Sequence, residues 1–292
     1  MYELHQAGDR SFYLDCPAKI GIYVNGSSAY LIDSGNDKDA GKRALKILNE
    51  WEWKLAGILI THSNADHIGG NSLLQQRTNC KIFSGGIESA FTEHPILEPS
   101  FLYGGYPFKE LRHKFLMAQE STVNDFSDPD FPQEIEIIPL KGHFFDMVGF
   151  RTPDDVVFLA DCLSSKETLD KYKIGFIYDV AEYIKTLETV KSLTAKMFVP
   201  SHAPVAEDIS ELAQYNIDAV KGIADRIVSL CSEPICFEAL LQKLFTEYEL
   251  KMSFEQYVLV GSTVRSYLAW LKDSDRLDGF FEDNMLLWRR KK

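Results

Sequence analysis

The chain has 292 residues, of which 45% are hydrophobic and 25% are charged, as in an ordinary globular protein. This length suits one large catalytic domain with a smaller appended unit. The formal net charge of −12 repels a phosphate backbone at long range, which argues against nonspecific nucleic-acid binding but leaves room for a local basic groove.

The first third predicts strands that lead into a helix. Short β-prone runs at Ile20–Val24 and Ala29–Ile32 are separated by the turn Asn25-Gly26. Apolar residues then recur with a helical period over Lys38–Trp51, and Leu55–Ile60 is a continuous apolar run that is typical of a strand buried on both faces. A helix followed by a buried strand predicts α/β layers.

A second series of elements repeats this alternation. The expected strands are Lys81–Phe83, Ile135–Leu140, Val156–Ala160 and Met197–Val199, with a helix over Tyr178–Leu193 before the last of them.

Residues 88–130 interrupt the series with an irregular, aromatic, turn-rich stretch, which we interpret as an insert that forms a lid. Cations among its aromatic residues favour an anionic substrate. The alternative is a solvated surface helix over Phe108–Gln119 with its aromatics packed inward, and such aromatics could also join two chains as a homodimer. The candidate substrate-binding residues are Tyr103, Tyr106, Lys109 and Arg112.

After about Val205 the pattern becomes mostly helical, so we divide the chain into residues 1–205 and a C-terminal domain, 206–292. Three helices followed by a β-hairpin are the outline of a winged-helix unit. In its third helix, residues 262–271 contain a single cation, Arg265, and the hairpin is rich in acidic residues. We therefore favour packing or dimerisation over nucleic-acid binding as the role of this domain. The expected elements are helices Ile209–Cys231, Phe237–Leu250 and Phe254–Leu271 and strands Leu277–Phe281 and Met285–Arg289.

Polar side chains gather where the predicted strands of residues 1–205 end. In open α/β layers, ligand sites collect at the carboxyl ends of strands. Four of the seven histidines and one aspartate follow such strands: His62, His67, His143, His202 and Asp161.

The densest cluster runs from Thr61 to Gly70. Side chains at alternate extended positions point the same way, so His62 and Asn64 can face one point. Asp66 and His67 then turn at the start of a helix and can face a second point nearby. Nitrogen and carboxylate donors of this kind suit zinc, iron or manganese.

This cluster resembles the HxHxDH motif of the metallo-β-lactamase superfamily. The resemblance covers roughly residues 10–205 and implies an α/β fold, the αβ/βα four-layer sandwich, followed here by the winged-helix-like domain. Four further elements occur in the order of the superfamily: Leu31–Gly35, Gly142-His143, Ala160-Asp161 and Pro200–His202.

The resemblance implies two metal positions that share a bridging aspartate. Asn64 stands where the superfamily has histidine, and an amide oxygen is a poorer donor to zinc than imidazole. One metal ion, or a tight and a loose one, is therefore expected, with zinc favoured and iron or manganese compatible. The implied ligands are His62, Asn64 and His143 for the first position, Asp66, His67 and His202 for the second, and Asp161 for both.

Such a site supports metal-assisted hydrolysis, with Asp66 as the catalytic residue that holds or deprotonates water. The substrate that we expect is a small anionic ester or thioester. Some superfamily members with a C-terminal winged helix, the β-lactamase-like 2 type, are similar in layout and cleave RNA, which keeps an endoribonuclease or phosphodiesterase as an alternative. A non-catalytic metal-binding module is the second alternative.

Three further residues lie next to these motifs in the sequence. We interpret Asp33 as structural, bonding backbone beneath the metal loop. Asp146 could orient His143 or simply cap a turn. Cys162 is expected to be a small buried hydrophobe rather than a ligand.

The five cysteines are odd in number and form no C-x-x-C pair, which favours a reducing compartment. The polar stretch Met1–Asp9 lacks the apolar run of a signal peptide, and no apolar stretch reaches the length of about 18 residues that crosses a bilayer. We therefore expect a cytoplasmic protein without a membrane span.

Overall fold

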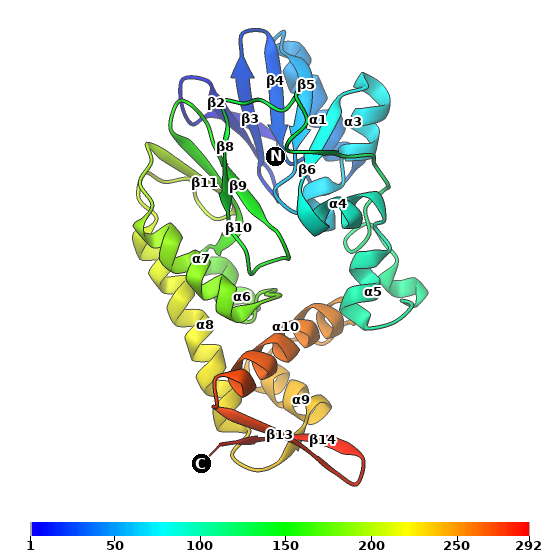
Figure 1. The fold of residues 1–292 in the computed structure, drawn as a ribbon, viewed down its shortest axis with the longest axis vertical. Coiled ribbons are helices and arrows are strands. Elements are labelled where there is room, and N and C mark those ends of the chain that lie inside the picture. Colours follow the sequence, from blue (N-terminus) through cyan, green and yellow to red (C-terminus); the bar gives the residue numbers. More distant parts are fainter. Residues whose placement is uncertain (1, 292) are drawn as a thin grey trace.

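A computed structural model describes residues 2–291 of the chain. Two β-sheets lie face to face, and helices cover the outer side of each (Figure 1). The seven strands of the first sheet follow chain order: β1 (Glu3–Gln6), β2 (Ser11–Asp15), β3 (Ile20–Asn25), β4 (Ser28–Ile32), β5 (Lys54–Leu59), β6 (Lys81–Ser84) and β7 (Asn124–Asp125).

The second sheet has the order β11-β10-β9-β8, in which β10 runs parallel to β11 and antiparallel to β9. Its strands are β8 (Glu136–Pro139), β9 (Val148–Arg151), β10 (Val156–Ser164) and β11 (Met197–His202).

Three hydrophobic cores define the layers. Phe83 of the first sheet and Phe158 of the second belong to the core between the sheets. The apolar face of α1 (Lys38–Glu50) and the helix α3 (Asn71–Thr78) cover the outside of the first sheet. The helices α7 (Val180–Ser192) and α8 (Ser210–Leu230) cover the outside of the second. The predicted αβ/βα four-layer sandwich is confirmed.

Strand β10 departs from its predicted end. The sequence predicts that it stops at Ala160 and that Asp161 follows it, but the strand continues to Ser164. Ala160 has a φ of +50°, and the pairing register with β11 shifts on both sides of it. Such a bulge re-aims the side chains that follow, so Asp161 reaches the site from within the strand.

The insert is more regular than its composition predicts. Residues 86–103 contain two helices, α4 (Gly86–Glu93) and α5 (Leu97–Tyr103). Pro99 argues against a helix in the sequence, but it lies in the first turn of α5, where a proline removes no helical hydrogen bond. The alternative of a helix over Phe108–Gln119 is wrong, because that stretch holds only the 3₁₀ turn η1 (Lys109–Leu111).

The C-terminal helices and hairpin lie where they are predicted. They share a continuous core with β10 and α7, and the insert packs against α10 through Leu102, Leu111 and Val258 (Figure 1). The winged-helix interpretation and the boundary near residue 205 stay predictions. The remaining elements are α2 (Ala65–Ile68), α6 (Lys166–Tyr172), β12 (Ile235–Cys236), α9 (Phe237–Glu247), α10 (Phe254–Asp273), β13 (Leu277–Glu282) and β14 (Met285–Arg290).

Among residues 2–291, every helix is too short or too polar to cross a bilayer.

Candidate metal centre

The strands of both sheets bring the predicted ligands to one place. The segment after β5 supplies His62 and the short helix α2, while β10 and β11 supply residues from the opposite sheet. Six side chains form two overlapping groups that could hold a metal ion, and both groups contain Asp161: Asp66, His67, Asp161 and His202 in one, and His62, His143 and Asp161 in the other.

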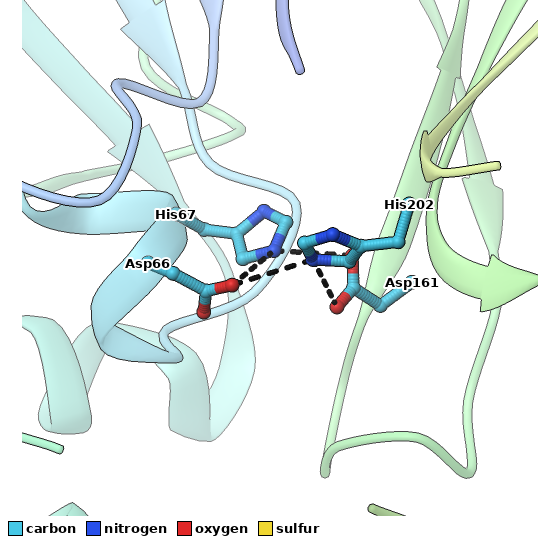
Figure 2. A group of neighbouring side chains, drawn as sticks. All are labelled: Asp66, His67, Asp161 and His202. Atoms are coloured by element: carbon cyan, nitrogen blue, oxygen red, sulfur yellow. Dashed lines mark ion pairs between the residues drawn. The ribbon is translucent and has the colours of Figure 1, made fainter. Parts of the chain in front are cut away.

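The larger group surrounds a point between α2 and the end of β11 (Figure 2). His202 Nε2 lies 3.2 Å from Asp161 Oδ2 and 3.3 Å from Asp66 Oδ2. His67 Nε2 is 3.1 Å from Asp161 Oδ1, yet both atoms are buried and neither has a hydrogen-bond partner within residues 2–291. Buried nitrogen and oxygen atoms that lie close together without hydrogen-bond partners are suited to bind one metal ion between them.

The smaller group shares Asp161 with the larger one. Asp161 Oδ2 is 4.0 Å from His62 Nε2 and 3.7 Å from His143 Nε2. His62 is fully buried, and its Nε2 also lacks a partner in the described chain. The two groups therefore have the donor chemistry and the shared carboxylate of a site for one or two divalent metals.

Charge within the cluster separates the histidines into two kinds. Burial alone would raise the pKa of Asp161, but the nearby His202 and His67 hold it well below its usual range. Against burial, Asp161 in turn raises the pKa of His202 to about 10 and that of His67 well above normal. Burial lowers the pKa of His62 and of His143. A metal entering the larger group would displace protons, so its affinity should fall in acid.

A comparison with protein families identifies this arrangement. The family model described as the metallo-beta-lactamase superfamily matches residues 14–202. The chain belongs to this superfamily. Its members bind one or two divalent metal ions, and the two ligand groups could hold them.

Two known relatives are similar to this chain over only part of their own length. A beta-lactamase-like protein 2 homolog from Drosophila melanogaster is 24% identical over 201 residues, which cover 66% of this chain and 61% of that protein. An atrochrysone carboxyl ACP thioesterase from Aspergillus fumigatus is 23% identical over 201 residues, 68% of this chain and 54% of that protein. The chain therefore spans less than two thirds of either relative.

A solved metallo-beta-lactamase family protein from Thermus thermophilus shares the fold over nearly the whole chain. Its TM-score is 0.72 and its identity 16%, over 96% of this chain and 99% of that one.

Asn64 is the departure from the superfamily motif. It is buried, and its Nδ2 donates a hydrogen bond of 2.8 Å to Glu98 Oε1. The amide oxygen Oδ1, which can accept a hydrogen bond or bind a metal, is buried and has no partner in the described residues. The bond to Glu98 thus leaves an oxygen free, which is compatible with a weak ligand.

Asp33 does more than the predicted backbone bond. It accepts hydrogen bonds from Thr61 N (2.8 Å), Thr61 Oγ1 (2.7 Å) and His67 Nδ1 (2.8 Å). Since the Thr61 hydroxyl donates to Asp33, the contact of 3.0 Å with His62 Nδ1 must have the ring as donor. Asp33 therefore sets both rings so that each Nε2 is free to bind a metal.

Two other interpretations are resolved by the structure. Asp146 does not orient His143; it accepts hydrogen bonds from Lys141 Nζ and from the backbone of Ile87 at the start of α4. Cys162 is fully buried in the core beneath the site, as predicted.

Two buried glutamates beside the metal loop, Glu88 and Glu98, were not predicted from the sequence. Glu98 accepts the amide of Asn64, and Glu88 accepts bonds from Ser63 N, Ser63 Oγ and Asp146 N. Burial raises the pKa of Glu88 from its ordinary 4.5 to about 7, although these bonds lower it. No local signal marks them, because their partners are distant in the chain. Ser63 and Asn64 lie 25 and 34 residues earlier, and Asp146 lies 58 residues after Glu88.

The variant Glu88→Gln should gain stability relative to the wild type as the pH rises. A carboxyl whose pKa rises on folding stabilises the fold below its unfolded pKa, and this contribution is lost as the pH passes through about 7. The relative gain should reach at most about 3 kcal/mol between pH 5 and 8, measured by urea unfolding of metal-free protein. The less buried Glu93→Gln on the same helix is the control; parallel pH profiles for wild type and Glu88→Gln would contradict this account.

The four predicted substrate-binding residues belong to neither ligand group. Arg112 Nη1 donates to Tyr106 Oη, and Lys109 is exposed in η1. Tyr103 lines a hollow of about 800 Å³ between α5 and α10 that contains none of the ligand residues. A cavity of about 210 Å³ is lined by the ligand residues His143, Asp161 and His202, and none of the four predicted substrate-binding residues lines it. Their role in binding substrate stays a prediction.

Proposed function

We propose that this chain is a metal-dependent hydrolase that cleaves a small anionic ester or thioester at a mono- or dinuclear site. The observation that carries the proposal is the shared carboxylate of Asp161 between two groups of ligand atoms. A divalent ion held there would polarise the scissile carbonyl and lower the pKa of water to about 7. The relative named as a thioesterase supports the choice of bond.

The residues of the chain have separate tasks in this proposal. Asp66 is the ligand most open to solvent, with a side chain that is 39% exposed, so it is placed to accept a proton from water. His67, His202 and Asp161 hold the second position. His62 and His143 hold the first, with Asn64 as a weak ligand, so we infer one tight and one loose metal, with zinc favoured by the four imidazoles.

The C-terminal cations do not favour the ribonuclease alternative. Arg265 packs its guanidinium on the ring of Phe237, 3.7 Å from the centroid. Arg276 pairs with Asp225, and Lys291 pairs with Asp275. Cations that are paired with carboxylates, as Arg276 and Lys291 are, contribute little to a groove that binds a phosphate backbone.

The test uses the full chain, purified and loaded in turn with zinc, manganese and iron. We expect metal titration to show one tight equivalent and a weaker second one. Hydrolysis of N-acetylcysteamine thioesters should require the metal, stop on chelation and return on its addition. Faster cleavage of RNA or of bis(p-nitrophenyl) phosphate would favour a nuclease, and metal uptake without any turnover would favour the non-catalytic module.

A further inference from the structure

A small cavity opens directly on the ligand groups. Its volume is about 210 Å³, and His143, Asp161 and His202 form one side of it. The opposite side comes from three segments: α6, the loop between α6 and α7, and the beginning of α10. A substrate bound to the metal centre can extend into this cavity, because the reacting atoms must lie beside the ligands.

The wall opposite the ligands is predominantly apolar. Leu259 and Val260 of α10 face this space together with Phe176, whose ring packs edge-on against His143 at 5.4 Å between centroids. Val260 is buried, whereas Leu259 and Phe176 are only partly covered. The other apolar members are Leu169, Tyr172 and Ile174, and the polar ones are Ser164, Thr168 and Gln256.

The cavity also continues inward. An adjoining hollow of about 60 Å³ shares His143, Asp161 and Phe176 with it and reaches Ile223 of α8 and Tyr267 of α10. At about 30 Å³ for each group of the size of a water molecule, the main cavity has room for roughly seven such groups and the extension for about two more. An unbranched apolar chain suits a small space that is lined mostly by apolar side chains.

We propose that this cavity binds the acyl chain of the substrate and that Leu259 on α10 sets the length of chain that is accepted. The inference rests on the proposed function, since it places the scissile carbonyl at the ligand groups and the acyl chain against α10. The substrate class is then an ester or thioester of a straight-chain acyl group of roughly six to nine carbons. The C-terminal helical region thereby becomes part of the specificity of the site.

Turnover of a thioester series tests the pocket. With zinc-loaded full chain and N-acetylcysteamine thioesters from acetyl to dodecanoyl, kcat/KM should rise about fourfold for each methylene until about octanoyl. Leu259→Phe should lower kcat/KM for octanoyl about 16-fold, the equivalent of two methylenes, and leave acetyl within about twofold. Leu259→Ala should move the maximum to a longer chain.

Matched substitutions separate the pocket from general packing. Leu250 is a partly buried leucine that precedes α10 and does not line the cavity, so Leu250→Phe and Leu250→Ala should keep the wild-type profile. Thermal unfolding checks that each variant folds. A wild-type profile that is flat with chain length, or one that neither Leu259 variant alters, would overturn the proposal.

A binding measurement decides the question without turnover. Straight-chain carboxylates from acetate to dodecanoate are titrated into the zinc-loaded protein by calorimetry. Affinity that rises with chain length in the wild type, but not in Leu259→Phe, supports the pocket, and equal affinity along the series refutes it. If no thioester is cleaved while this binding pattern holds, the proposed hydrolysis fails and the apolar site stands.

Discussion

Replacing Asp161 by asparagine is expected to lower kcat/KM for thioester hydrolysis by more than about 100-fold, the upper end for groups that only orient a ligand. Asp161 belongs to both ligand groups, so its loss removes an anionic donor from each metal position at once. Its charge also keeps His67 and His202 close in a buried site. Asparagine preserves the volume, so the fold should survive and the effect should fall on the metal.

Elemental analysis and kinetics of the same preparation measure this effect. The metal content of Asp161→Asn should fall together with its activity, and its thermal unfolding without metal should stay close to that of the wild type. Asp170→Asn, on the exposed side of α6, changes an aspartate outside the ligand groups and should alter neither quantity. Full metal content and activity within tenfold of wild type in Asp161→Asn would remove the bridging role.

Local signals were enough to find most of the predicted ligands. His62 and His67 follow the buried strand β5, and His202 ends β11, so the rule that sites gather at strand ends applies to them directly. Strand β5 was visible because both of its faces are covered, which leaves a continuous apolar run in the sequence. Strands β1, β2, β7 and β9 were not predicted.

Features that depend on tertiary packing were not visible. The bulge that carries Asp161 into the site rests on a left-handed alanine, which no local pattern predicts. Glu88 and Glu98 look like ordinary solvated acids in sequence and are buried only because α4 and α5 fold over the metal loop. The pattern does not show which charged residues a later segment will cover.

The residues that contact the substrate were still harder to predict from the sequence. Composition drew attention to the cations and aromatics of the insert, yet Tyr106 and Arg112 pair with each other. The wall of the cavity at the ligands instead includes Leu259, more than a hundred residues after His143. A leucine in an amphipathic helix is indistinguishable from a core residue until the helix is placed, so this wall could emerge only from the structure.

Replacing Asp33 by asparagine is expected to weaken metal binding at both positions by about 10- to 100-fold. One oxygen of Asp33 accepts from both Thr61 Oγ1 and His67 Nδ1, and Thr61 in turn accepts from His62 Nδ1. If the amide nitrogen of asparagine took the place of that oxygen, a hydrogen-bond donor would face the two donors Thr61 Oγ1 and His67 Nδ1. The His67 ring would lose its acceptor, and the hydroxyl that orients His62 would have to turn.

Thr61→Val separates the two branches of this network, because it removes the link to His62 and leaves the bond between Asp33 and His67. Competition with a chromophoric chelator should therefore show one weakened position in Thr61→Val and two in Asp33→Asn. The exposed Asp39→Asn on α1 is the control for charge. Metal affinity that is unchanged in Asp33→Asn, with only thermal stability reduced, would limit Asp33 to the backbone role first assigned to it.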